Sequence, residues 1–390
     1  MTGPDVRAAL LAVQVPEELE AQRRSWRVVR AAHAGREPLR RRPRRARLLV
    51  ALALLAALAA AALSPPGRAV GDWIRDRVEG KEPARPALVR LPAAGQLLVL
   101  SEEGPWLVRR DGSKRLLGRY DDAAFSPSAR YVAVTDGHRL LAVDPQGTPR
   151  WQLARPRPVS DPRWSPAPGF RVAYREGGTL RLVAGDGTGD RLLAEPVAPV
   201  APAWLPRPGA TVLAYAHAAG GVRVVDTETG EQLWTAAPPS QPRKLVWSAD
   251  GRFLLAVTAG GRHPLYRADG RVARLLRTPG GQELLDAELA GGEPSLAYAV
   301  YDPGLRRTAV VAGGRRLTTL DGRVEDLLPS PDGAWLLAAW PDADQLLFLP
   351  LEPGRGLVAV GDVRREFAPG AVRAAAFPEL RGWCCAPAGQ

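Results

Sequence analysis

Histidines are the first residues to test for metal or acid–base chemistry in this chain. The 390-residue sequence has four of them: His33, His138, His217 and His263. A zinc site needs three or four ligands that converge on one point, and these histidines are far apart in the sequence. We therefore expect no metal site, and we expect His138 and His217 to lie on the surface near hairpins.

The only two cysteines, Cys384 and Cys385, are adjacent. A disulfide between neighbours closes no loop, so it lacks the chain-entropy effect by which most disulfides stabilise a fold. We interpret the pair as incidental thiols rather than as a structural bridge. A redox or lipid-related role is the alternative.

The acidic and glycine-rich clusters match neither a calcium-binding nor a phosphate-binding motif. Neither Asp121-Asp122 nor the pair Asp342 and Asp344 has the D-x-[DN]-x-[DN]-G spacing of a calcium loop. The stretch GDGTGD at 185–190 does not open a helix, as a phosphate-binding loop should. The sequence contains no G-x-S-x-G nucleophile elbow. We find no catalytic constellation and predict a protein that is not an enzyme and holds no cofactor.

The basic charge of the chain is concentrated near its start. The net charge is +12, and residues 1–47 contain twelve arginines against five acids. A nucleic-acid binder should instead show a basic stripe with aromatics on a folded surface. We therefore expect no nucleic-acid partner and look for a membrane next to the basic run.

An apolar segment follows the basic run at 47–64. It is short and alanine-rich against the 20 or so residues of a typical spanning helix. The arginines stand on its N-terminal side: Arg40, Arg41, Arg42, Arg44, Arg45 and Arg47. This asymmetry predicts a cytoplasmic N-terminus and an extracytoplasmic C-terminal part. We favour a retained single-pass anchor in the cell membrane over a cleaved signal peptide or a buried core helix.

The residues before this anchor, 1–46, predict a basic and partly helical cytoplasmic tail. Pro16 followed by Glu17, Glu18 and Glu20 is typical of a helix start. A basic helix next to a membrane can rest on anionic lipid. It can also dock a cytoplasmic partner, which would allow signalling across the membrane.

Beyond the anchor, one phrase recurs every roughly 40 residues. It reads FSPSARYVAV at 125–134, WSPAPGFRVAY at 164–174, WLPRPGATVLAY at 204–215, WSADGRFLLAV at 247–257 and PSPDGAWLLAAW at 329–340. Weaker copies begin near 91 and 289. Each phrase predicts a strand end, a Pro/Asp/Gly turn and an apolar strand.

Further strands and turns follow each phrase, such as VRVVD at 222–226 and QLWT at 232–235. Four short strands in about 42 residues are typical of a propeller blade. We predict an all-β propeller, most consistent with seven four-stranded blades, although six or eight fit as well. The stretch VRAAAF at 372–377 is expected to supply a strand to the first blade and close the ring.

The repeated residues have a structural interpretation. Trp164, Trp204 and Trp247 recur in register and are expected to pack between blades. The pairs Asp250-Gly251 and Asp332-Gly333 are expected to form the tight turns, because glycine supplies the positive φ that such turns need.

The turn Ser330–Gly333 with its apolar strand resembles TolB-type and WD-repeat propellers, and VVDTETGEQLW at 224–234 resembles quinoprotein-like repeats. The resemblance implies the fold. Some quinoprotein dehydrogenases carry a pair of adjacent cysteines beside the cofactor, which makes a quinone site a further reading of Cys384 and Cys385. The expected organisation is a tail at 1–46, an anchor at 47–64, a linker at 65–84, a propeller at 85–385 and a short tail at 386–390.

We expect a binding scaffold whose propeller face, or a polar end of its central channel, contacts a protein, peptide or other ligand. The oligomeric state is left open. The alternative is a metal-dependent hydrolase or lactonase working in the channel. That reading would use Asp121, Asp122 and Asp161, which form no repeating set around the ring. A propeller partner for a separate peptidase domain is a third possibility.

Overall fold

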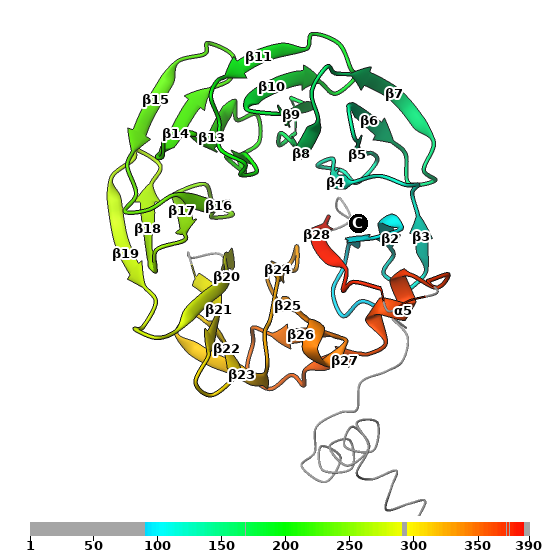
Figure 1. Ribbon diagram of the computed structural model, residues 1–390, viewed down its shortest axis with the longest axis vertical. Coiled ribbons are helices and arrows are strands. Elements are labelled where there is room, and N and C mark those ends of the chain that lie inside the picture. The colour runs from blue at the N-terminus through cyan, green and yellow to red at the C-terminus, as the bar shows by residue number, and fades with distance from the viewer. Residues whose placement is uncertain (1–89, 168, 291–294, 372, 374, 386–390) are drawn as a thin grey trace, which may run out of the picture. The chain divides into compact units, whose positions relative to one another are not determined.

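Seven four-stranded sheets form a ring in this protein (Figure 1). The computed structural model describes residues 90–385, apart from 168, 291–294, 372 and 374. The sheets are arranged as blades around a centre, with one strand of each blade innermost (Figure 1). The predicted seven-bladed β-propeller with four strands per blade is confirmed.

The blades are numbered in chain order, and their strands are given from the centre outward. Blade 1 has β28 (Glu379–Cys384), β1 (Gln96–Ser101), β2 (Gly104–Val108) and β3 (Lys114–Leu116). Blade 2 has β4 (Asp122–Phe125), β5 (Val132–Asp136), β6 (Arg139–Val143) and β7 (Pro149–Ala154). Blade 3 has β8 (Val159–Trp164), β9 (Arg171–Glu176), β10 (Thr179–Ala184) and β11 (Arg191–Ala194).

The remaining blades follow the same plan. Blade 4 has β12 (Ala203–Trp204), β13 (Val212–Ala216), β14 (Val222–Asp226) and β15 (Gln232–Ala236). Blade 5 has β16 (Pro242–Trp247), β17 (Phe253–Thr258), β18 (Arg262–Arg267) and β19 (Val272–Arg277). Blade 6 has β20 (Glu283–Ala290), β21 (Ser295–Asp302), β22 (Arg307–Ala312) and β23 (Arg315–Asp321). Blade 7 has β24 (Leu327–Pro329), β25 (Trp335–Trp340), β26 (Gln345–Pro350) and β27 (Val358–Val360).

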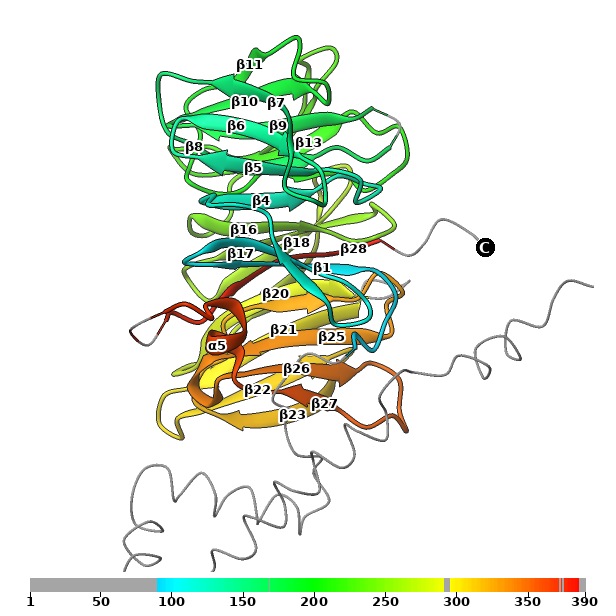
Figure 2. The ribbon, with the colours of Figure 1, turned by 90° about the vertical axis from the view of Figure 1, so that its right-hand side faces the viewer.

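The ring closes through a strand from the C-terminal end, but not the strand predicted. β28 pairs antiparallel with β1, so the first blade combines both ends of the propeller (Figures 1 and 2). The stretch 372–377 was the wrong choice. It lies between β28 and the short helix α5 (Val363–Phe367) and contributes no strand among its described residues. The physical reason is Trp383, whose large ring is buried only when 379–384 is the innermost strand.

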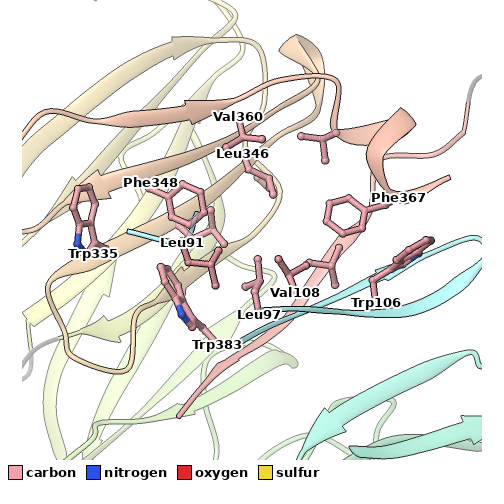
Figure 3. Close-up of a cluster of buried hydrophobic side chains, with 14 of the residues drawn as sticks. Leu91, Leu97, Trp106, Val108, Trp335, Leu346, Phe348, Val360, Phe367 and Trp383 are labelled. Carbon is pink, nitrogen blue, oxygen red and sulfur yellow. The ribbon is translucent and has the colours of Figure 1, made fainter. Parts of the chain in front are cut away.

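A buried apolar cluster fills the closing seam between blades 7 and 1 (Figure 3). Trp383 of β28 meets Phe348 of β26 edge to face, with ring centroids 5.5 Å apart. Trp106 of β2 meets Phe367 of α5 in the same way at 6.1 Å. The helix therefore covers the outer part of this seam, and burial of these aromatic side chains stabilises the closed propeller.

The predicted turns owe their shape to their side chains. Ser330 donates a hydrogen bond to Asp332 at 2.5 Å and accepts one from the backbone N–H of Trp335 at 2.9 Å. Gly333 follows with φ +68°. Ser248 and Asp250 make the same contacts, which shows why this short motif recurs at the start of apolar strands.

The segments predicted to contact the membrane lie outside the described residues. These are the tail at 1–46 with Arg40, Arg41, Arg42, Arg44 and Arg45, the anchor at 47–64 with Arg47, and the linker at 65–84. The short tail at 386–390 is outside them too. Within the described part of the chain, no helix is long and apolar enough to cross a membrane.

Candidate functional site

The recurring tryptophans end the inner strands and line the central channel. Trp164, Trp204 and Trp247 are at most 9% exposed. The indole N–H of Trp204 donates to the carbonyl oxygen of Arg163 in blade 3 at 2.9 Å, and that of Trp247 donates to Ala203 in blade 4 at 3.1 Å. Each of these two rings therefore ties its blade to the preceding one.

The channel is a cavity of about 570 Å³ lined by the inner strands of all seven blades. Charged residues recur along the inner strands, contrary to the sequence interpretation. Three residues before the repeat starts at 125, 164, 247, 289 and 329 stand Asp122, Asp161, Lys244, Asp286 and Asp326. Of these, Lys244, Asp286 and Asp326 line the channel.

Three of these aspartates bind the backbone of the next blade. Asp122 accepts a hydrogen bond from the N–H of Asp161 at 2.9 Å. Asp286 accepts from Leu327 at 2.9 Å, and Asp326 accepts from Leu380 of the closing strand at 3.0 Å. These carboxylates therefore act first as links between blades.

A charged cluster occupies one side of the channel. The ammonium group of Lys244 lies 2.7 Å from Asp286 and 2.6 Å from Glu288. Although burial alone would lower it, these two carboxylates raise the pKa of Lys244. Burial, followed by the charge of Asp286, raises the pKa of Asp326 to about 6. Lysine thus serves as the counter-ion of the buried carboxylates.

The residues named for hydrolytic chemistry are engaged in hydrogen bonds and ion pairs of the fold. Asp121 accepts a hydrogen bond from the N–H of Gly137, and Asp161 forms an ion pair with Arg175 at 2.7 Å. In the described ranges, no three His, Cys, Asp or Glu side chains are grouped so that they could hold a metal ion. The channel geometry therefore gives the hydrolase alternative no specific support.

The histidines lie apart, and the cysteines are joined. His138 is exposed and His217 half-buried, each beside a hairpin, whereas His263 is buried on β18. His33 lies outside the described residues. Cys384 and Cys385 form a disulfide at the end of β28, so their interpretation as incidental thiols was wrong. The sequence argument considered a bond between the two neighbours and set it aside because such a bond closes no loop.

A second cavity lies in a seam, that is, in the interface between two neighbouring blades. The contacts that close other seams show what is missing from this one. Trp151 of β7 donates its indole N–H to the carbonyl oxygen of Gly185 in blade 3 at 2.7 Å. Trp234 of β15 donates to Ala268 in blade 5 at 2.9 Å. Each acceptor directly follows the third strand of its blade. An outer-strand tryptophan thus covers the seam from outside.

Arginines make the same kind of contact in two other seams. Arg191 of β11 donates to the carbonyl oxygen of Thr227 in blade 4, and Arg315 of β23 donates to that of Leu351 in blade 7 at 2.9 Å. Both acceptors again follow the third strand directly.

Blade 5 departs from this pattern. Arg274 of β19 pairs with Leu265 just before a register shift, as Trp234 pairs with Val224 and Trp151 with Ala142. Yet Arg274 has no hydrogen-bond or ion-pair partner among the residues described. The corresponding acceptor position in blade 6 is Gly313, which it does not contact.

Among the described residues, no side chain closes the outer side of the seam between blades 5 and 6. By contrast, a Cβ atom added to Gly270, beneath Trp234, would lie 2.8 Å from the ring, because Trp234 fills the seam between blades 4 and 5. The resulting cavity, called here the blade 5–6 groove, has a volume of about 1120 Å³. That is slightly above the usual range of about 300–1,000 Å³ for ligand pockets.

The groove has apolar walls. One wall is a face of blade 6, formed by alternate residues of β21 and β22, which include Leu296, Tyr298, Val300, Ala309 and Val311. The other is a face of blade 5 with Leu255, Leu265 and Leu276. Exposed leucines also lie at the groove, since Leu275 is 36% and Leu305 70% exposed.

The polar groups of the groove are mostly basic. Arg274, Arg277 and Arg316 line it and have no acidic partner among the described side chains. A fourth arginine, Arg307, pairs with Asp321 at 2.8 Å. Among the described residues of the lining, the acid is Asp302, whose carboxylate accepts hydrogen bonds from the backbone of its own turn. The groove therefore combines apolar walls with a positive rim.

His263 belongs to the blade 5 wall. Its Nδ1 accepts a hydrogen bond from the N–H of Thr258 at 3.1 Å, so Nε2 carries the proton and donates to Thr278 at 2.9 Å. Burial, with a smaller effect of Arg243, lowers the pKa of His263. The ring is thus held neutral as part of the wall.

Sequence reasoning missed the groove, because the residue types alone do not show it. Aligning the outer strands on the glycine of the preceding turn places Trp151, Arg191, Trp234 and Arg274 at one position. Arg191 contacts the next blade whereas Arg274 does not, so only the packing of the described residues shows which seam is left open.

Of two solved structures similar to this chain, the one with a TM-score above 0.5 supports the fold. The chain is similar to Kluyvelomyces marxianus Hsv2 with a TM-score of 0.52 and 10% sequence identity, over 69% of this chain and 94% of that one. It is also similar to Kuenenia stuttgartiensis hydrazine synthase with a TM-score of 0.46 and 15% identity, over 59% of this chain and 76% of that one. No protein-family model and no curated protein matches the sequence. These likenesses concern the fold alone.

Proposed function

We propose that this protein is a binding scaffold that uses the blade 5–6 groove to hold a ligand or partner. The observation that carries the proposal is the open seam at Arg274, where two other blades place a sealing tryptophan. Exposing an apolar cavity of this size to water costs free energy that a bound ligand would recover. The channel is a weaker candidate, because its charged groups are already occupied by one another and by the backbone.

We further propose that the propeller is extracytoplasmic and anchored by 47–64. The arginine asymmetry around that segment supports this orientation. The Cys384–Cys385 disulfide is consistent with it, because disulfides persist mainly in oxidising compartments. The basic tail at 1–46 would then be available to a cytoplasmic partner.

Site-specific photo-crosslinking in native membranes tests the binding role. A photoreactive residue replaces Leu276 in the groove, and in a matched control it replaces Leu192, which is 50% exposed on the outer strand of blade 3. We expect a discrete adduct only from position 276, and we expect Arg274→Trp to remove it by filling the groove. Equal adducts at both positions, or none at either, would contradict the proposal.

Thiol labelling tests the orientation. A Leu192→Cys variant of the full chain is treated in intact spheroplasts with a membrane-impermeant maleimide. Labelling without lysis supports an extracytoplasmic propeller, whereas labelling only after lysis places it in the cytoplasm. Arginine-to-cysteine replacement at Arg36 in the tail provides the opposite control, with labelling expected only after lysis.

A further inference from the structure

The chemical class of ligand follows from the walls and rim of the blade 5–6 groove, given the binding role proposed above. Both walls are faces of complete β-sheets. On one side β17, β18 and β19 are paired in sequence order, and on the other β20 to β23 are paired likewise. Their backbone groups are therefore largely used in the ladders, and the walls present mainly side chains.

Such walls suit a hydrocarbon chain better than an extended peptide. A peptide strand inserted between them would bring N–H and C=O groups that find few partners, and burying such groups unpaired is costly. A hydrocarbon chain has no polar group to satisfy, and each CH₂ that it buries between the walls favours binding. Leu265, Leu276, Leu296 and Tyr298 provide the apolar contacts on the two sides.

The arginines at the rim of the groove favour a ligand that carries negative charge. Arg274, Arg277 and Arg316 bring three guanidinium groups to the lining, and the one carboxylate there, Asp302, is held by its own turn. Planar guanidinium groups bind carboxylate and phosphate oxygens through paired hydrogen bonds. Such bonds are stronger beside an apolar surface than in open water.

We infer that the blade 5–6 groove binds an anionic amphiphile, with its hydrocarbon chain between the blades and its carboxylate or phosphate head on the arginine rim. Arg274 is the central residue of this site. It stands at the position of Trp151, Trp234 and Arg191 but, among the described residues, makes no hydrogen bond to the next blade, so it leaves the apolar space open and supplies charge at its entrance. A free fatty acid and an anionic membrane lipid share this chemistry.

Calorimetric titration of the full-length protein in phosphatidylcholine nanodiscs tests the inference, with empty nanodiscs as the blank. The probes are dodecanoate, dodecanol and inorganic phosphate. We expect saturable binding of dodecanoate at one site per chain, binding about tenfold weaker for dodecanol, and none for phosphate. Equal affinity for dodecanoate and dodecanol would overturn the role of the rim, and no saturable dodecanoate binding would overturn the inference.

Two substitutions of Arg274 distinguish the effect of its charge from the effect of filling the groove. Arg274→Leu keeps the groove open and should weaken dodecanoate binding about tenfold while sparing dodecanol. Arg274→Trp should fill the groove and abolish binding of both. The matched controls are Arg115→Leu and Arg115→Trp, because Arg115 is an exposed outer-strand arginine in blade 1. Unchanged binding in both Arg274 variants, with melting temperatures showing folded protein, would place the dodecanoate site elsewhere.

Adding phosphatidylglycerol to the nanodiscs identifies the source of the amphiphile. Competition with dodecanoate would show that a bilayer lipid reaches the groove. Undiminished dodecanoate binding would assign the site to a free amphiphile. Failure of this inference is distinguishable from failure of the proposed function: a protein adduct at position 276 without dodecanoate binding would leave a binding scaffold whose ligand is not an amphiphile.

Discussion

Trp234 of blade 4 donates its indole N–H to the carbonyl oxygen of Ala268 in blade 5 at 2.9 Å. The same ring covers Gly270 and lies 5.6 Å from the ring of Tyr266, measured between centroids. One outer-strand side chain therefore closes the seam between two blades by both packing and hydrogen bonding. The absence of such a side chain from β19 is what distinguishes the seam between blades 5 and 6.

We expect Trp234→Ala to lower the free energy of unfolding by about 2 kcal/mol, less than for a fully buried tryptophan because the ring is partly exposed. Trp234→Phe should keep most of the packing and cost about 1 kcal/mol for the lost hydrogen bond. Denaturant unfolding measures both values. Leu233→Ala is the control, since Leu233 is 45% exposed and should change stability little. An effect of Trp234→Ala no larger than that of the control would show that this contact does not hold the seam.

The pKa of Asp326, raised to about 6 mainly by burial, predicts a pH dependence of stability. Because the folded-state pKa exceeds the unfolded value of about 3.9, the stabilising contribution is present below about pH 4 and is lost as the pH rises through about 6. Asp326→Asn keeps an oxygen to accept the hydrogen bond from Leu380 but removes the charge.

Asp326→Asn should therefore be more stable than the wild type at pH 7.5 by about 3 kcal/mol and similar to it at pH 4. Thermal unfolding across this range measures the difference. Asp122→Asn is the matched control, since Asp122 makes the same link between blades while Asp326 stays in place. A constant offset of Asp326→Asn at all pH values would refute titration of this group as the cause.

His263 predicts the opposite pH dependence. Its pKa is lowered, chiefly by burial, so its contribution to stability is present above the unfolded value of about 6.5 and is lost as the pH falls toward the folded value. Protonation would also remove the acceptor for the N–H of Thr258. In the Asp326→Asn background, the protein should lose stability between pH 7 and pH 5.

Adding His263→Gln should flatten that profile, because the titrating ring is gone. Thermal unfolding at the two pH values provides the measurement. His138→Gln is the control, since His138 is exposed on the surface of blade 2. If His263→Gln retains the full loss of stability on acidification, another group is responsible.

The Cys384–Cys385 disulfide is expected to contribute little to global stability. The bonded residues are neighbours in the sequence, so the bond closes no loop of the unfolded chain. The Cys384→Ser/Cys385→Ser double variant should differ from the oxidised wild type by about 0.5 kcal/mol or less in denaturant unfolding. A loss of several kcal/mol would show that the bond holds the closing strand β28 in place.

The amino-acid sequence by itself determined the all-β class, the seven-fold repeat and most strand positions. These depend on local chemistry: Ser-x-Asp-Gly at 248–251 and 330–333 forms its turn with its own side chains, and the apolar strand follows at once. The recurrence of Trp164, Trp204 and Trp247 then indicated where the inner strand of each of these blades ends.

Which residues of different blades contact one another was decided only by the tertiary structure. It chose β28 over 372–377 to close the ring, because burial of Trp383 depends on the space between blades 7 and 1. It brought Lys244 against Asp286 and Glu288 of the next blade, and it left the space beside Arg274 uncovered by any of the described residues. A repeated sequence specifies each blade locally, whereas a channel or a groove depends on how side chains from different blades fill the space between them.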